Sequence, residues 1–461
     1  MKRTARAAMT GVAAIAFGAA GTAVAFDPDL SLSLFDGRFT ARLIGRFNLD
    51  AAAYDQAPAR PLLIDDRRGS VGVSSPETLS ARDLAGGFNV RRAHLGVEGR
   101  LPGDLRYRVS FDLSGSGGDG PSRLREAWLS YDGFGPTLQV GAFAPPANLD
   151  DATGSDDSMF LERASPAELS RSLAGGTGRY AAGIKANGDT WFAALHVTGG
   201  TLRDGSDVDS QTGLVGRAAW LAASGEGFHI HLGANVSYVT NVADAGATQS
   251  VRYPIRLRDR PELRVDPTRL IDTGKIDAAG AFAAGVEFAA NWNSVTFQAE
   301  HFWYGLDRRD PLLADPRFTA WYAEAGWLVT GGSRRYAMAR AAFGAPLSAD
   351  GAKDREAPDA IELAVRFSHT DLDYRAGQAG APGDADSVRG GRQNIWTFGA
   401  TWYVEPGARL LLNYQIVDVA RLNPGWAGDP EPFGPSPETP PTGAGIGQSY
   451  QVLSMRAQVS F

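Results

Sequence analysis

The sequence contains no cysteine and has only four lysines among its 45 basic residues. The absence of cysteine excludes disulfide bonds, thiolate catalysis and cysteine-based metal sites. After the first 25 positions there is also no run of about 18 apolar residues, which excludes a transmembrane helix in that part of the chain. Such a chain can still cross a membrane as a closed β-barrel, because a barrel satisfies every backbone polar group between its strands.

The first 25 residues have the three parts of an export signal. Lys2, Arg3 and Arg6 form a short basic region, and an alanine-rich apolar run follows at 7–20. Ala23-Val24-Ala25 then provides the small side chains of a cleavage site. We therefore predict a signal peptide at 1–25 and a single domain at 26–461 that begins at Phe26.

Strict alternation of apolar and polar residues is the main structural signal in the chain. In the C-terminal segment one set of alternate positions is apolar and the other polar: Leu453, Met455, Ala457, Val459 and Phe461 against Ser454, Arg456, Gln458 and Ser460. Successive strand side chains point to opposite faces. A segment at 36–54 repeats the pattern with three arginines on its polar face, which need water around them. A barrel that is apolar outside and polar inside provides these surroundings.

Runs of this kind predict an all-β fold, a 16-stranded antiparallel transmembrane β-barrel. The candidate strands are 36–54, 88–101, 104–114, 123–133, 137–144, 178–186, 189–199, 211–223, 226–240, 280–293, 294–307, 318–330, 358–373, 391–405, 408–420 and 449–461. A further run at 334–345 would make seventeen, whereas bacterial single-chain barrels have an even number of strands. Assigning that run to a connection leaves short turns that alternate with long loops, and the turn at 331–357 is the one exception.

The sequence offers little for catalysis. It has six histidines, and no nucleophile elbow, phosphate-binding glycine loop or zinc motif is present. We therefore expect no enzyme activity, no metal, no cofactor and no nucleic-acid partner. A barrel hydrolase and a surface or structural barrel remain as alternatives.

Arginines are concentrated in the connection at 241–279, where Arg256, Arg258 and Arg260 alternate and Arg264 follows. An extended segment would project these side chains as a series of cations, which suits passing an anion between several sites of moderate affinity. The alternative is that they face lipopolysaccharide phosphates or pair with nearby carboxylates. The connection at 145–177 is acidic instead, and it includes Asp151 and Asp156.

Four segments resemble motifs of the phosphate-selective porin O and P family of Gram-negative outer membranes. They are Phe88–Gly99 with its Arg91-Arg92 pair, Met159–Ala164, Ile361–Ser368, and Thr397–Tyr403 followed by Arg409–Tyr414. The resemblance covers about residues 36–461. It implies a homotrimer of 16-stranded barrels in the cell outer membrane, in contact with lipid and lipopolysaccharide, with loop 3 (145–177) folded into each lumen.

The resemblance also implies which residues handle the substrate. It places Arg46, Arg91, Arg92 and Asp112 at a constriction, and Arg256, Arg258, Arg260 and Arg264 on a fifth-loop arginine ladder. Phosphate-selective members carry basic residues in loop 3 where this chain has Asp151 and Asp156. The expected function is therefore passive diffusion of small anions, such as phosphate or phosphorylated solutes. A weakly selective general diffusion porin is the alternative.

Overall fold

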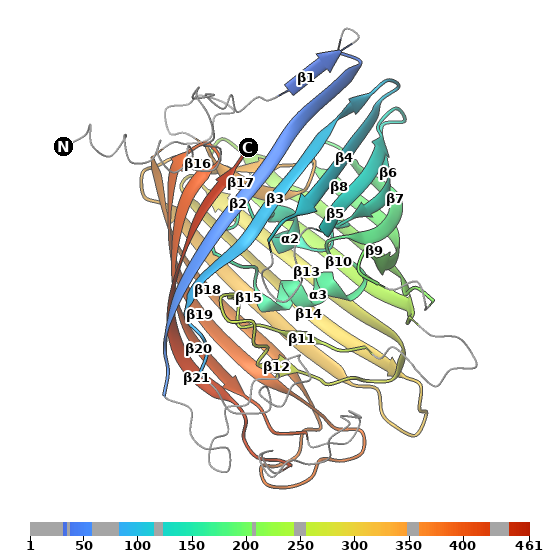
Figure 1. Cartoon of the computed structure of the whole chain (residues 1–461), viewed down its shortest axis with the longest axis vertical. Coiled ribbons are helices and arrows are strands. Elements are labelled where there is room, and N and C mark those ends of the chain that lie inside the picture. The colour runs from blue at the N-terminus through green and yellow to red at the C-terminus, as the bar shows by residue number, and fades with distance from the viewer. Residues whose placement is uncertain are drawn as a thin grey trace, which may run out of the picture.

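The computed structural model describes residues 31–34, 37–57, 83–114, 123–204, 209–243, 255–347, 359–424 and 442–461. Sixteen antiparallel strands form a closed barrel (Figure 1), because each strand pairs with the next along the chain and the last pairs with the first. The predicted signal peptide lies outside the described residues. Among those residues no helix has the length and apolar character needed to cross a membrane.

The first half of the barrel consists of β2 (Phe39–Asp55), β3 (Gly87–Leu101), β4 (Leu105–Asp112), β5 (Arg123–Tyr131), β6 (Thr137–Phe143), β7 (Arg179–Asn187), β8 (Trp191–Thr201) and β9 (Thr212–Gly225). The second half consists of β10 (Phe228–Asn241), β13 (Ala278–Trp292), β14 (Val295–Arg308), β15 (Arg317–Leu328), β18 (Ala360–Tyr374), β19 (Val388–Glu405), β20 (Ala408–Ala420) and β21 (Gln448–Ser460). The predicted sixteen-stranded barrel is confirmed.

The run at 334–345 belongs to a connection, as predicted. It forms the small hairpin of β16 (Ser333–Ala337) and β17 (Ala342–Leu347), which is separate from the barrel sheet. This hairpin packs against inward-facing side chains of the wall. Arg217 on β9 donates to the carbonyls of Arg340 and Ala341, and Phe343 on β17 packs with Leu149 of loop 3.

Alternation sets the two faces of the wall as the sequence predicted. On β21, Leu453, Met455 and Val459 are each about half exposed, whereas Ser454 and Arg456 between them are buried. The polar side chains face the interior, where segments of the chain cover them. The apolar face is left outside, as a barrel surrounded by lipid requires.

The barrel closes where β2 pairs with β21, with Asp50 opposite Arg456. The short strand β1 (Ser31–Leu34) pairs with the start of β2, opposite Phe39–Arg42, beyond the point where β21 ends. In Figure 1, β1 and the C-terminus lie at the same end of the barrel.

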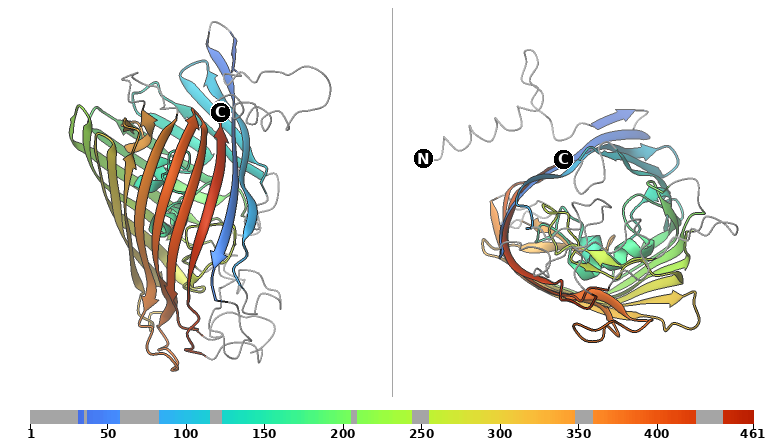
Figure 2. Two further views of the ribbon diagram at one scale, coloured as in Figure 1. Left: turned by 90° about the vertical axis from the view of Figure 1, so that its left-hand side faces the viewer. Right: turned by 60° about the horizontal axis from the view of Figure 1, so that its bottom comes forward.

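Loop 3 carries two helices, α2 (Leu149–Thr153) and α3 (Ser165–Ala174). The right-hand view of Figure 2 shows both within the ring of strands. Carboxylates from elsewhere in the chain bind their N-terminal N–H groups. Glu300 on β14 accepts from the N–H groups of Leu149 and Asp150 at 3.0 and 3.1 Å, and Glu262 accepts from the Ser165 N–H at 2.9 Å. Exposed N–H groups and the helix dipole both favour an anion at a helix N-terminus.

Candidate functional site

Two β-bulges change which side chains face the interior of the barrel. On β3, Asn48 of β2 pairs with Arg92 and the next residue, Leu49, pairs with Val90, so that Arg91 is an extra residue. On β5, Ser110 of β4 pairs with Glu126 and Phe111 pairs with Leu124, so that Arg125 is extra. Strict alternation would send one member of each pair outward. A bulge re-aims a side chain, and both Arg91 and Arg92 thereby reach the interior.

Glu162 of loop 3 is the carboxylate that three of the predicted arginines, Arg91, Arg92 and Arg264, contact. Arg91 binds it through two nitrogens at 2.7 and 3.0 Å, and Arg92 lies 3.7 Å away. The surrounding cations at contact distance are Arg91, Arg92, Arg264 and Arg456. Arg456 is itself paired with Asp50 on β2. We call Glu162 and these four arginines the Glu162 node.

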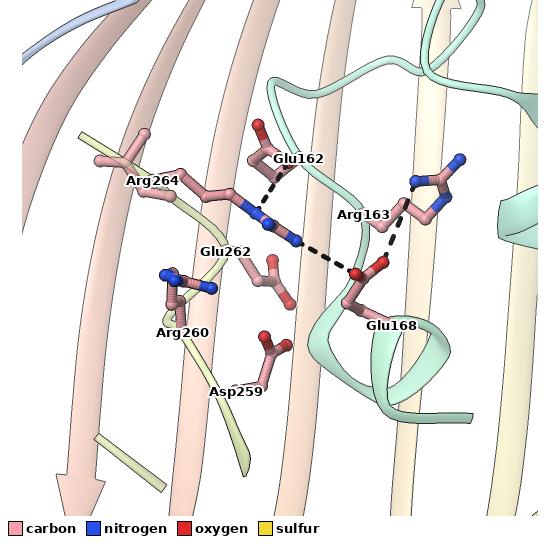
Figure 3. A pocket seen from close by; sticks show the side chains of 8 residues that line it. Glu162, Arg163, Glu168, Asp259, Arg260, Glu262 and Arg264 are labelled. Carbon is pink, nitrogen blue, oxygen red and sulfur yellow. Dashed lines mark hydrogen bonds and ion pairs between the residues drawn. The ribbon is translucent and has the colours of Figure 1, made fainter. Parts of the chain in front are cut away.

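Loop 3 and loop 5 (the connection at 241–279) meet beside this node (Figure 3). Arg264 of loop 5 lies between Glu162 at 3.6 Å and Glu168 at 3.0 Å, and Arg163 points toward Glu168 from the other side. Although burial opposes it, Arg171 and Arg264 hold the pKa of Glu168 at about 2. Burial, with the charge of Glu168, raises the pKa of Asp259 to about 7. The junction therefore contains both firmly charged and easily protonated carboxyl groups.

The other predicted constriction residues form a row across adjacent strands. Arg46 on β2 lies opposite His94 on β3, and His94 lies opposite Asp112 on β4. The His94 ring nitrogen Nε2 is 3.5 Å from a carboxylate oxygen of Asp112. Arg46 donates to Ser155 Oγ at 2.7 Å and forms an ion pair with Asp156. The row therefore contacts loop 3 at Arg46.

The fifth-loop arginines have different surroundings. Arg256 pairs with Asp272 through two nitrogens, at 2.7 and 2.6 Å. Arg258 lies on β11 (Arg258–Asp259), which pairs with β12 (Ile271–Asp272). Burial and the nearby Arg269 and Arg256 lower its pKa. Arg260 is buried and donates to the Pro267 carbonyl, and burial together with Arg264 lowers its pKa to about 10.

These cations form a continuous electrostatic series. Arg258 lies within range of Arg269, and Arg269 and Arg91 both act on Arg260. The series continues on β3, where Arg91 and Arg92 are adjacent and His94 lies opposite Arg46 of β2. It therefore runs from loop 5 to the wall of the first strands.

The two loop 3 aspartates differ in what they contact. Asp151 does not oppose the wall arginines, because it is bound within its own loop by Arg171 at 2.7 Å and Arg163 at 3.2 Å. A lysine at 151 would therefore face two guanidinium groups. Asp156 does meet a predicted arginine, since it pairs with Arg46 and its side chain is 38% exposed.

Sequence reasoning missed three parts of this site. The bulge that turns Arg125 inward leaves no local signal, and the arginine simply precedes a glutamate. The alternation identifies Arg456 only as one polar residue of the last strand, yet it is buried between Asp50 and Glu162. Glu262, which binds Arg366 and Ser368 on β18 and the start of α3, lay among the arginines of loop 5.

A model of the family described as phosphate-selective porin O and P matches residues 78–426 of this chain. The chain belongs to this family. Porin O of Pseudomonas aeruginosa is 24% identical over 341 residues, which cover 70% of this chain and 75% of that protein. An uncharacterized protein of Caulobacter vibrioides is 29% identical over 374 residues, 77% of this chain and 68% of that protein. The protein is therefore an outer-membrane porin, a channel rather than an enzyme.

Solved porin structures align with most of this chain. The anion-selective porin from Comamonas acidovorans aligns over 92% of this chain and 100% of its own, with 12% identity and a TM-score of 0.49. OmpT of Vibrio cholerae aligns over 93% of this chain and 99% of its own, with 10% identity and a TM-score of 0.47.

Proposed function

We propose that this porin is a passive pore without catalytic activity that prefers small anions, with inorganic phosphate or a phosphorylated solute as its substrate. The observation that carries the proposal is the series of guanidinium groups from loop 5 to β2. Arg264 of loop 5 meets Arg91 and Arg92 of β3 at Glu162, and Arg46 of β2 meets loop 3 at Asp156. Guanidinium forks match phosphate oxygens bidentately. A series of sites with moderate affinity allows an anion both to enter and to leave.

The difference in solvent exposure between the two side chains of an ion pair supports the same preference for anions. In two ion pairs made by loop 5 arginines the arginine is more exposed than its acid: Arg256 is 23% exposed and Asp272 0%, and Arg264 is 24% exposed and Glu162 7%. A solute in the lumen would therefore meet the cation of each pair first. The whole chain has a formal charge of −7, so the preference must come from this local placement.

A weakly selective pore is the second candidate. Asp156 is 38% exposed and its partner Arg46 only 17%, and Asp112 in the same row is 30% exposed. Around Arg46, therefore, the two aspartates are more exposed than the arginine. They would reduce discrimination between anions and cations.

The test is the reversal potential of the purified porin in planar bilayers under a KCl gradient, repeated with added phosphate. We expect a potential of the sign given by chloride permeation, and a chloride conductance that falls as phosphate is added, because phosphate would occupy the arginine sites. A potential of the opposite sign together with no block by phosphate would contradict the proposal.

We further propose that three copies assemble through the outer faces of β2–β6. Every exposed tryptophan among the described residues lies elsewhere, on β8, β9, β13, β14, β15 and β19. The outer face of β2–β6 exposes apolar side chains such as Phe47, Leu95, Val109, Phe111 and Val140. Tryptophan is enriched where barrels meet the membrane interface, so an outer face on which the described residues expose no tryptophan suits contact with another copy. The remaining outer surface would contact lipid and lipopolysaccharide.

The assembly is tested by the mass of the unheated porin in mild detergent, measured by sedimentation. We expect a trimeric mass for the wild type and a shift toward the monomer for Phe111→Arg, because the substitution buries an unpaired charge in the contact. Phe297→Arg on β14 is the matched control outside the sector. A monomeric wild type, or equal shifts for both variants, would count against this contact surface.

A further inference from the structure

The β5 bulge delivers a second cation to the level of Arg46. Arg125 is the extra residue of that bulge, so it and the adjacent Glu126 both face the interior. Arg125 Nη1 lies 2.6 Å from Glu126 Oε1, and its side chain remains 23% exposed. The cross-strand row of Arg46, His94 and Asp112 continues to Arg123 on β5, two residues before Arg125.

The wall around Arg125 has more cations than carboxylates. Glu126 is shared between Arg125 at 2.6 Å and Arg108 at 3.5 Å. Glu98, the next carboxylate along the wall, is shared between Arg108 and Arg42. Three arginines of β2, β4 and β5 therefore share two glutamates, which leaves a positive excess beside the row of Arg46, His94 and Asp112.

We infer that Arg125 is a specificity-determining residue of the pore, and that its guanidinium and that of Arg46 together bind a small oxyanion. This inference rests on the proposed function. Each guanidinium has five N–H donors. The side-chain contacts described above use one nitrogen of Arg125, at Glu126, and two of Arg46, at Ser155 and Asp156. Donors on both residues remain for an anion with several oxygens. Two planar guanidinium groups, one on β2 and one on β5, favour phosphate over the spherical chloride.

The node residues Arg91 and Arg92 have a different role in this arrangement. Both surround the buried carboxylate of Glu162, whereas Arg125 belongs to the wall beside the lumen. Arg91 and Arg92 therefore position loop 3, and Arg46 and Arg125 contact the solute. The two bulges thus place one extra arginine for each task.

The experiment compares wild type with Arg125→Gln, Arg125→Lys and the control Arg106→Gln in planar bilayers. Arg106 also lies in an ion pair on the neighbouring strand, with Asp132 at 2.6 Å, but it is 53% exposed and close to the turn. We expect Arg125→Gln to lower the ratio of chloride to potassium permeability about tenfold, because one charge about 6 Å away in water changes the occupancy of each ion about threefold and in opposite directions. Arg125→Lys should keep this ratio and lose much of the block by inorganic phosphate.

The outcomes separate this inference from the function on which it rests. If wild type prefers anions and Arg125→Gln behaves like Arg106→Gln, Arg125 has no role in selectivity and the proposed function stands. If wild type itself prefers potassium and phosphate does not block, both proposals are wrong. A loss of folding is distinguished by the unheated mobility in gels and by the single-channel conductance. If Arg125→Gln fails to fold, the test is made with Arg125→Lys. An unchanged block by phosphate in that variant would contradict the proposed anion site at Arg46 and Arg125.

Discussion

Replacing Glu162 by glutamine is expected to release loop 3 from the barrel wall and to enlarge the pore. The carboxylate lies among four guanidinium groups, of which Arg91 and Arg456 approach to 2.7 Å. Glutamine has nearly the same shape but no charge, so the four cations would repel one another without compensation. Removing one partner of a buried ion pair costs about 3–5 kcal/mol. Loss of about 3 kcal/mol lowers the equilibrium constant for loop docking about 100-fold.

Single-channel recording measures this effect directly. Glu162→Gln should give a higher and noisier conductance than wild type, with weaker discrimination between chloride and potassium. Glu98→Gln is the matched control, because Glu98 also contacts two arginines but is 21% exposed and touches no loop 3 residue in the described contacts. Exposed ion pairs contribute about 0–1 kcal/mol. Equal conductance for both variants would show that Glu162 does not hold the loop.

Arg334→Gln is expected to displace the β16–β17 hairpin from the inside of the barrel. Arg334 is buried and binds Glu362 with two nitrogens at 2.7 and 2.6 Å. It also donates to Tyr403 Oη at 2.9 Å and to the Asp157 carbonyl at 2.7 Å. Glutamine leaves the buried Glu362 carboxylate without its cation, which again costs about 3–5 kcal/mol. Because the Asp157 contact belongs to loop 3, the loop should also become less firmly held.

The neighbouring residue provides the control for this second prediction. Arg335 is exposed where Arg334 is buried, so Arg335→Gln should behave like wild type. We expect Arg334→Gln to increase conductance, to lower the midpoint of thermal unfolding and to admit larger neutral sugars in liposome-swelling assays. An unchanged size limit for sugars would mean that the hairpin does not restrict the lumen.

The barrel could be predicted from the sequence because alternation is a local property. The sequence of a single strand shows which of its side chains face outward. On β21, for example, Leu453 and Met455 are half exposed and Ser454 between them is buried. The even strand number then assigned 334–345 to a connection, and the structure agrees. The prediction needed no knowledge of which strands meet.

The candidate site was less predictable because its charged residues form ion pairs, and the sequence does not show which residues pair. The acidic character of loop 3 is visible in the sequence, but it does not show that Arg163 and Arg171 of the same loop bind Asp151. The partner of Arg91 and Arg92 is Glu162, about 70 positions away, and a bulge is needed for both arginines to point inward. Such pairings depend on how loop 3 enters the barrel.

The pairing of Asp50 with Arg456 has a consequence for the order of folding. These residues belong to the first and last strands of the barrel, and Arg456 also binds Glu162 and the Leu161 carbonyl. Loop 3 therefore obtains this cation only once the final strand has joined the first. In a nascent barrel with an open seam, Glu162 would lack Arg456 and the loop would be held less firmly. Pairing of the last strand with the first is therefore needed before Glu162 has all four of its cations.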